Sequence, residues 1–288
     1  MSISNSLPED LRRKLEHLAE SSESYYKELT PLERAEREVR WYNADRGSLY
    51  EEDGYNCDRC NNRGWIAKVI YIGERPECVL ADCECMEVRR SLRHMRASGM
   101  DRLAERCTFA NFETTEPWQK ALVDQVIAFT ENPGGQRWLY IGGQSGAGKT
   151  HLGVAAAVKI MKETHMRARY YVWPDEIRKT WGDSDAYEWF IDSCQKAPIL
   201  YLDDLFKPTD SARTPSANEI RAAFAILNYR YNNTEGVTII SSEYPLTDVI
   251  GFDEALGGRI YQRTQEGTAL TIKKDQRRNY RLKGEVVI

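Results

Sequence analysis

The sequence predicts an α/β protein in which a parallel sheet with flanking helices follows a smaller helical and cysteine-rich module. Three observations support this prediction. The chain has 288 residues, enough for one full domain and a smaller one. From residue 138 onward, five short apolar runs alternate with helical stretches, which is typical of a parallel sheet with crossover helices. A glycine-rich loop follows the first of these runs. We expect a helical segment at 1–54, a cysteine-rich module at 55–105 and the sheet domain at 106–288.

Composition argues against a membrane protein and against secretion. Hydrophobic residues make up 41% of the chain and charged residues 29%, and no run of about 18 apolar residues is present. The polar N-terminus lacks the features of a secretory signal, so we expect a cytoplasmic protein. The net charge of −4 conceals a basic C-terminal end. Its cationic residues are Arg259, Arg263, Lys273, Lys274, Arg277, Arg278, Arg281 and Lys283.

The first fifty residues contain two helix starts. Ser6 precedes Pro8, and Thr30 precedes Pro31 and Glu33, so each start offers a capping oxygen beside a proline. The apolar faces of these helices predict either the core of a small helical bundle or a docking surface for a partner protein. They consist of Leu11, Leu15 and Leu18 in the first helix, and Leu32, Ala35, Val39 and Tyr42 in the second.

Four of the seven cysteines have the spacing of a metal site. Cys57 and Cys60 form one close pair, Cys83 and Cys85 form another, and 22 residues (61–82) separate the pairs. Zinc takes four tetrahedral thiolate ligands, and cysteines of a reducing compartment serve more often as ligands than as disulfides. We therefore predict a structural Zn²⁺ site rather than a redox dithiol. The other three are Cys78, an alternative ligand for the second pair, and Cys107 and Cys194, expected to be buried thiols.

Five apolar runs predict the strands of the sheet, and the polar stretches 182–189 and 207–218 predict surface loops. The predicted strands lie in 137–143, 168–173, 198–204, 237–242 and 269–273.

The glycine-rich loop matches the phosphate-binding pattern G-x-x-x-x-G-K-[ST] and lies between a predicted strand and a predicted helix. In such a loop, backbone amides and the helix N-terminus surround the phosphates of ATP or ADP. Lys149 would reach the β- and γ-phosphates, and the Thr150 hydroxyl would bind Mg²⁺. The alternative is a chance glycine-rich turn, with His151 an ordinary helix residue. The predicted nucleotide-binding residues are Gly143, Gln144, Ser145, Gly146, Ala147, Gly148, Lys149, Thr150 and His151.

The third predicted strand ends in two carboxylates beside this loop. Asp203 would hold Mg²⁺, and Asp204 would orient and deprotonate the attacking water, a division that suits hydrolysis of the γ-phosphate. After the next strand, Ser241, Ser242 and Glu243 occupy a position from which a polar group could sense that phosphate.

Two arginines after the fourth strand are candidates for completing the ATP site of a neighbouring subunit. An arginine at a subunit boundary would stabilise charge in the transition state. We favour Arg259 in this role over Arg263.

The basic C-terminal end predicts a nucleic-acid contact, because cations around an aromatic side chain suit a phosphate backbone. The predicted contact residues are Lys273, Lys274, Arg277, Arg278 and Arg281 around Tyr280, with Arg221 and Arg230 as weaker candidates.

The order of these motifs resembles that of the DnaC/DnaI-type helicase loaders and of the related IstB transposition ATPases, over most of the chain from about Tyr55 onward. One departure is Glu243, where the family commonly has asparagine; a carboxylate cannot donate a hydrogen bond to phosphate, so the sensor role falls to Ser242. The matching stretches are CDRCNNRGW with CEC, CTFANFETT, LYIGGQSGAGKTHL, ILYLDDL, NYRYNN, TIISS, GGRIYQR and RRNYRLKG.

The resemblance implies an AAA+ ATPase with a five-stranded parallel sheet and no separate lid domain. It further implies a homo-oligomer or a helicase-bound ring with ATP sites between subunits. The N-terminal module would grip a replicative DnaB-type helicase, and the protein would place that helicase on single-stranded DNA. The principal alternative is an IstB-like ATPase that regulates a transposase on DNA. A small-molecule kinase and a DNA-binding protein with a vestigial nucleotide site are weaker alternatives.

Overall fold

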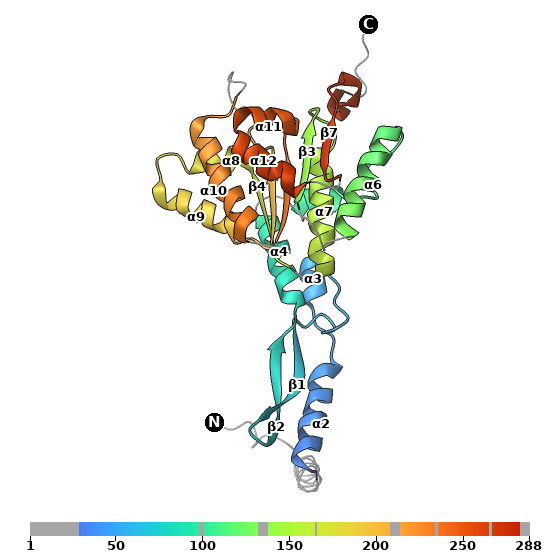
Figure 1. Ribbon diagram of the computed structural model, residues 1–288. Helices are drawn as coiled ribbons and strands as arrows, with labels where there is room; N and C mark the ends of the chain where they lie inside the picture. Colours follow the sequence, from blue (N-terminus) through green and yellow to red (C-terminus); the bar gives the residue numbers. More distant parts are fainter. Residues whose placement is uncertain are drawn as a thin grey trace, which may run out of the picture. The chain divides into compact units, whose positions relative to one another are not determined.

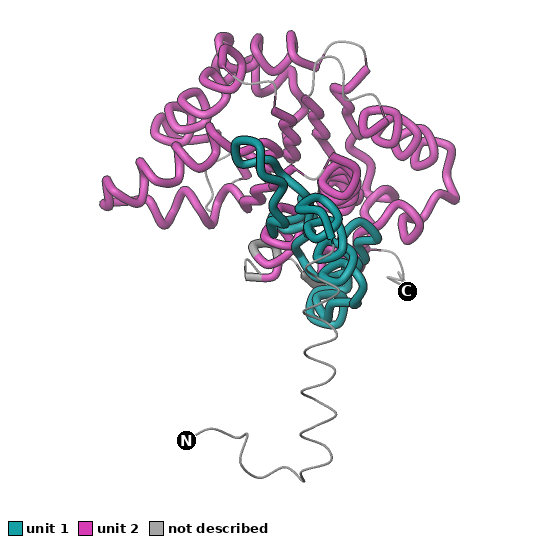
Figure 2. The backbone as a smooth tube through the Cα atoms, turned by 90° about the horizontal axis from the view of Figure 1, so that it is seen from below, with its two compact units in different colours: residues 1–86 teal, residues 87–288 magenta. Residues whose placement is uncertain are grey.

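A computed structural model (Figure 1) describes residues 29–97, 101–131, 138–164, 166–207, 214–233, 236–264 and 267–282. The chain divides into two compact units, Met1–Met86 and Glu87–Ile288, shown in different colours in Figure 2. The helix predicted after Ser6, with its apolar face, lies outside the described residues, and so does Lys283.

Unit 1 contains a β-hairpin that we did not predict from the sequence. Strand β1 (Trp65–Ile72) pairs antiparallel with β2 (Arg75–Asp82), and Ile72 faces Arg75 across a two-residue turn. Gly73 takes φ 65° in this turn, a conformation that glycine adopts without strain. The hairpin occupies most of the 22 residues between the cysteine pairs and so brings their ends together. The other elements of this part are α2 (Pro31–Ala44), α3 (Leu49–Asp53) and the start of α4 (Cys85–Ala97).

Helix α2 begins where predicted. Thr30 and Glu33 form a capping box, in which each side chain accepts a hydrogen bond from the other residue's backbone amide. The helix lies against both strands of the hairpin and buries Ala35, so its face packs on a sheet rather than in the predicted helical bundle. Leu32 and Tyr42 of the same face stay exposed.

Unit 2 contains the predicted five-stranded parallel sheet, with strand order β4-β5-β6-β3-β7. The three central strands are buried along their whole length, which explains their nearly continuous apolar sequences. All five strands fall within the predicted ranges. They are β3 (Trp138–Gly143), β4 (Ala168–Val172), β5 (Ile199–Asp203), β6 (Val237–Ser241) and β7 (Ala269–Ile272).

Helices cover both faces of the sheet, as Figures 1 and 2 show. Helix α7 (Lys149–Thr164) lies on one face with α6 (Pro117–Glu131), and the helices from α8 to α12 lie on the other. Right-handed crossovers require this, because the chain crosses the sheet in one direction through α7 and returns through the later helices. The remaining helices of the unit are α5 (Asp101–Arg106), α8 (Trp173–Lys179), α9 (Ser184–Gln195), α10 (Ala217–Asn233), α11 (Leu246–Phe252) and α12 (Glu254–Arg263).

One predicted loop is wrong. Residues 184–189 belong to α9, because Asp183 caps the helix by accepting a hydrogen bond from the Ala186 amide at 2.9 Å. Phe190, Ile191 and Cys194 then bury one side of the helix against the core. The predicted loop at 207–218 lies mostly outside the described residues. After β7, the described chain forms two short 3₁₀ turns, η2 (Gln276–Arg278) and η3 (Tyr280–Leu282).

Candidate functional site

The phosphate-binding loop connects β3 to α7, as predicted. Gly143, Gly146 and Gly148 have φ angles of 104°, 69° and 90°, a region in which side chains are unfavourable. A Cβ atom on Gly146 would lie 1.9 Å from the side-chain oxygen of Asn279, and one on Gly148 would lie 2.5 Å from the Phe112 ring. These two glycines therefore allow other segments of unit 2 to approach the loop closely.

Lys149 lies buried at the start of α7, with 6% of its surface exposed. Its ammonium donates hydrogen bonds to the carbonyl oxygens of Gly143 at 3.1 Å and Gln144 at 2.9 Å. Burial lowers the pKa of Lys149, and the nearby carboxylates of Glu243 and Asp204 only partly oppose this effect. A cation held on the loop beside a helix N-terminus is suited to bind phosphate oxygens.

Asp203 is buried at the end of β5 and accepts hydrogen bonds from four hydroxyl groups. Thr150 and Tyr201 donate to Oδ1 at 3.0 Å and 2.8 Å, and Tyr170 donates to Oδ2 at 2.8 Å. The Ser241 hydroxyl also donates to Oδ1. Burial and the charge of Asp203 raise the pKa of both phenols, which keeps them as donors. The predicted Mg²⁺ residues Thr150 and Asp203 therefore lie side by side.

Asp204 leaves the strand with a left-handed φ of 55° and turns its carboxylate toward Lys207. Its backbone amide donates to the Ser241 hydroxyl at 3.0 Å, which fixes this turn. The Lys207 ammonium lies 2.7 Å from Asp204 Oδ2 and 3.8 Å from Glu243 Oε1. Asp204, Lys207 and Glu243 all line the same pocket as the phosphate-binding loop.

Ser242, the predicted sensor, uses its hydroxyl elsewhere. It is fully buried, donates to the Leu205 carbonyl at 2.7 Å and accepts from the Tyr244 amide at 3.1 Å. Glu243, in contrast, lines the pocket. The sensor role of Ser242 stays a prediction.

The pocket beside the loop has a volume of about 500 Å³. His151 forms part of its wall, with its Nε2 2.7 Å from the Thr108 carbonyl oxygen and its ring edge-on to Phe112 at 5.3 Å. The segment around Phe112 was noted in the sequence only as a stretch that resembles loaders, and its place in the pocket was not predicted. Besides the loop, His151, Asp204, Lys207 and Glu243, the lining residues are Arg106, Asn111, Phe112, Glu113, Tyr280 and Arg281.

The basic C-terminal segment lies over the phosphate-binding loop. The Tyr280 amide donates to the Gly146 carbonyl at 2.9 Å, and the Asp275 amide donates to Gln144 Oε1 at 2.9 Å. The Tyr280 hydroxyl also donates to the Glu113 carbonyl at 3.1 Å. The segment predicted to bind nucleic acid is therefore also a wall of the pocket.

Of the predicted nucleic-acid contacts, some face solvent and one is excluded. Lys273, Lys274, Arg277 and Arg281 are all exposed, and Arg277 also pairs with Asp275 at 2.8 Å. Arg230 is wholly buried, and its guanidinium donates to backbone carbonyls and to a threonine hydroxyl. Its proposed nucleic-acid contact is wrong, because the side chain holds strand and helix ends together inside the unit.

Arg259, the predicted arginine finger, lies on α12 away from the pocket of its own chain. Its guanidinium donates to Asn228 Oδ1 at 2.8 Å and to the Ala255 carbonyl at 2.7 Å, and it stacks over the Phe224 ring at 5.1 Å. It lines a separate surface hollow. Arg263 stacks over the Tyr231 ring at 4.8 Å. Arg259 therefore does not line the pocket beside the phosphate-binding loop of its own chain, and its role in a neighbouring subunit's site stays a prediction.

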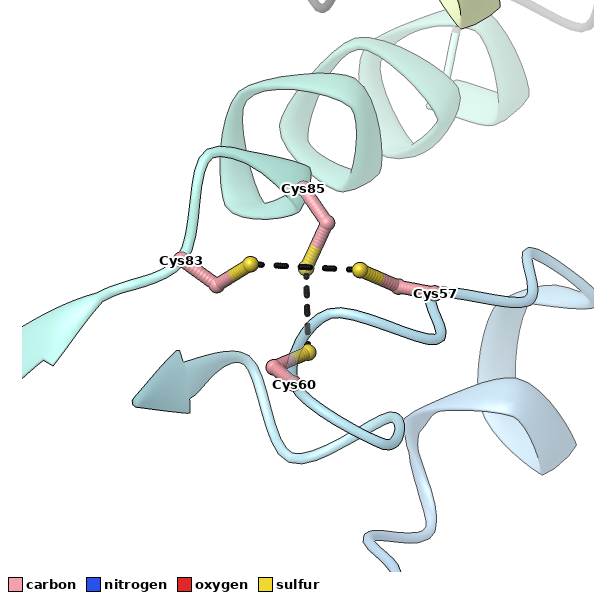
Figure 3. Close-up of side chains that lie close together, drawn as sticks. All are labelled: Cys57, Cys60, Cys83 and Cys85. Atoms are coloured by element: carbon pink, nitrogen blue, oxygen red, sulfur yellow. Dashed lines mark hydrogen bonds between the residues drawn. The ribbon is translucent and has the colours of Figure 1, made fainter. Parts of the chain in front are cut away.

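In unit 1, the four predicted cysteine ligands converge (Figure 3). Their sulfur atoms all lie within 4.8 Å of one another, with 3.8 Å between Cys57 and Cys83 and 3.6 Å between Cys60 and Cys85. Zn–S bonds of about 2.3 Å in a tetrahedron place sulfur atoms about 3.8 Å apart, so the cluster fits Zn²⁺. Cys78 lies outside it, and Cys107 and Cys194 are buried thiols, as predicted.

The environment of the cluster favours the thiolate at Cys60, whereas burial raises the pKa of Cys83. Burial raises the pKa of Cys60, but hydrogen bonds from the Gly64 amide and the neighbouring thiols outweigh this effect and lower it to about 7. Thiolate is the form that binds metal. The sulfur–sulfur distances, and the lowered pKa of Cys60 alone, therefore support the zinc prediction.

The strand, the phosphate-binding loop and the Thr150–Asp203 pair define unit 2 as a P-loop nucleotide-binding fold. No protein-family model matches the chain. Among curated proteins, it is 29% identical over 207 residues to the uncharacterized protein YqaM of Bacillus subtilis (strain 168), covering 69% of this chain and 66% of YqaM, just under two thirds. It is 28% identical over 249 residues to the phage-like element PBSX protein XkdC of the same organism, covering 84% of this chain and 91% of XkdC.

Two solved structures are similar to this chain at low sequence identity. A DnaC helicase loader matches with a TM-score of 0.47 and 22% identity, covering 60% of this chain and 98% of that chain. A DnaI structure matches with a TM-score of 0.48 and 20% identity, covering 60% of this chain and 93% of that chain.

Among the described residues, no helix is both long and apolar enough to cross a bilayer.

Proposed function

We propose that this protein is an AAA+ ATPase that loads a replicative hexameric helicase onto single-stranded DNA. The observation that carries the ATPase part is that the phosphate-binding loop, the buried Lys149, Thr150 and the carboxylate of Asp204 line one pocket. Asp203 accepts a hydrogen bond from Thr150 at 3.0 Å. A kinase would transfer the phosphate to an acceptor, whereas a carboxylate at this position suits activation of water.

Each residue has a distinct task in the proposed hydrolysis. Lys149 and the loop amides bind the phosphates, and Thr150 with Asp203 would hold Mg²⁺, which neutralises charge on the phosphates. Asp204 orients and deprotonates the attacking water. Arg259 of a neighbouring subunit stabilises the charge that develops in the transition state, which its position away from its own pocket permits.

Steady-state hydrolysis and nucleotide binding test these roles together. Asp204→Ala should bind ATP with little change but hydrolyse it about 10²-fold more slowly or worse, because the general base is lost. Arg259→Ala should lose hydrolysis while keeping nucleotide binding, and Arg263→Ala is its matched control. Undiminished turnover in either of the first two variants would remove that residue from its role.

The loader part of the proposal rests on the motif order and on the cysteine module. We propose that Zn²⁺ occupies the four-cysteine cluster and orders unit 1 as the partner-binding part. This unit exposes large apolar side chains, among them Trp41, Tyr71 and Ile72, with 69%, 64% and 62% of their surfaces accessible. Such exposure is suited to protein contacts. The basic residues of the C-terminal segment supply the proposed contact with single-stranded DNA; they are Lys273, Lys274, Arg277, Arg278 and Arg281 around Tyr280.

A pull-down with the full chain as bait, in lysate of the source cells and with zinc retained, tests the partner. Mass spectrometry should identify a hexameric replicative helicase with the wild-type chain and lose it with Cys60→Ser. Recovery of a transposase instead would favour the IstB-like alternative. Recovery of neither would count against both.

A further inference from the structure

We propose that Lys207 is the residue by which this site distinguishes a nucleoside triphosphate from a diphosphate. This inference rests on the proposed nucleotide pocket and names a terminal-phosphate ligand within it. Lys207 follows the predicted Asp203-Asp204 motif by only a few residues, and it was not among the residues that the sequence pattern singled out.

The position of Lys207 is fixed by two carboxylates of the pocket. Its ammonium lies 2.7 Å from Asp204 Oδ2 and 3.8 Å from Glu243 Oε1. The side chain is one-third exposed, and it lines the same pocket as Lys149 and Thr150. Burial lowers its pKa, but the charges of Asp204 and Glu243 outweigh this effect and raise it, so the group stays an ammonium.

The two pocket lysines occupy different places. Lys149 is buried and bonded to carbonyls of the loop itself, where any bound phosphate chain would contact it. Lys207 is held instead beside Asp204, the carboxylate predicted to face the attacking water and hence the phosphate under attack. A cation at that end of the pocket contacts the last phosphate of a triphosphate, which a diphosphate lacks.

The negative charges of Asp204 and Glu243 favour a cation at this end of the pocket. Asp204 and Glu243 both line the pocket, and a terminal phosphate adds negative charge next to them. Glu243 cannot donate a hydrogen bond, and the Ser242 hydroxyl donates to the Leu205 carbonyl. An ammonium has three N–H donors, so Lys207 can keep Asp204 as a partner and still donate to a phosphate oxygen. Lys207 thus supplies the hydrogen-bond donor that neither Ser242 nor Glu243, the two residues after β6, provides.

The test compares dissociation constants of the non-hydrolysable analogue AMPPCP and of ADP, each with Mg²⁺, for the full chain. Lys207→Met should weaken AMPPCP about tenfold or more and change ADP less than about twofold; Lys207→Arg should retain most of the AMPPCP affinity. Lys159→Met is the matched control, because Lys159 is also ion-paired, to Glu163 at 2.5 Å, but lies outside the pocket. The unchanged ADP constant shows that each variant is folded.

Two results would overturn the inference. An equal loss for AMPPCP and ADP would make Lys207 a general cation of the pocket, and an unchanged AMPPCP constant would remove it as a ligand. A wild-type protein that binds neither nucleotide would refute the nucleotide pocket itself, and the inference with it. Because the unmutated chain alone would show that failure, a failure of the proposed nucleotide pocket can be distinguished from a failure of the Lys207 inference.

Discussion

The four-cysteine cluster and the hydroxyl groups around Asp203 both bring polar side chains close together, but they differ in which parts of the chain supply these side chains. The cysteines come from one stretch of chain, 57–85, whereas the partners of Asp203 come from a helix and three strands between residues 150 and 241. The carboxylate is held by protein hydroxyls, whereas the sulfurs contact one another, and the Gly64 amide donates to the Cys60 sulfur at 3.3 Å.

The two units also differ in how many apolar side chains they bury. In the described part of unit 1, the buried apolar residues other than the cysteines are Ala35 and Ala67. Unit 2 has a large core that includes Trp138, Trp173 and Phe190. This difference predicts that unit 1 depends on a bound metal for its fold, whereas protein hydroxyls already hold the Asp203 carboxylate of unit 2.

The largest expected effect tests the first half of this comparison. Cys60→Ser or a strong chelator should unfold unit 1, because structural zinc contributes on the order of 10 kcal/mol to small modules of this kind. Tryptophan fluorescence and hydrogen exchange of residues 29–86 would report the loss. Cys78→Ser, in the same unit but outside the cluster, should have little effect. A folded unit 1 without bound metal would contradict the comparison.

At Asp203, we expect a substitution to change stability less than one in the four-cysteine cluster, but to change activity strongly. Asp203→Asn keeps the shape of the side chain while removing the charge that would hold Mg²⁺. Hydrolysis should fall about 10²-fold or more, since a metal supplies several kcal/mol of transition-state stabilisation. Thermal unfolding of unit 2 should not respond to EDTA in the wild-type chain. If EDTA lowered its unfolding temperature, the site would not be formed by the protein alone.

The smallest effect concerns the tyrosines around Asp203. Tyr170→Phe removes one of four hydrogen bonds to a buried carboxylate and should destabilise unit 2 by about 1–3 kcal/mol in urea unfolding. Tyr261→Phe is the control, because that ring is 56% exposed on the same unit. Equal stability of the two variants would mean that the hydroxyl cluster does not hold the carboxylate.

Sequence patterns predicted the parts of the molecule whose signal is local. Each strand of unit 2 is a short apolar run, and the loop at Lys149 and the pair Asp203-Asp204 are recognisable from neighbours in the chain. The hairpin of unit 1 was not predicted, although Val69, Ile70 and Ile72 before Gly73 form a strand pattern, because the spacing of metal ligands fixes only the length of the chain between them and not its structure.

The residues that the sequence did not predict owe their roles to tertiary contacts. Tyr170 and Tyr201 are 31 residues apart in the chain but face each other on neighbouring strands. Phe112 reaches the pocket from a segment before α6. Lys207 is recognised as a pocket residue only from its place beside Glu243, which is distant in the sequence. Such pairings depend on strand register and loop paths, which local patterns do not contain.

The contact between Tyr280 and Gly146 has a consequence for the order in which the protein is made. Strand β7 pairs with β3 next to the loop, and the Tyr280 amide bonds to the loop itself. A nascent chain that has emerged only as far as β6 already contains Lys149, Asp203 and Asp204. It lacks the wall of the pocket formed by Tyr280 and Arg281, so the pocket is complete only after residues 269–282 have left the ribosome.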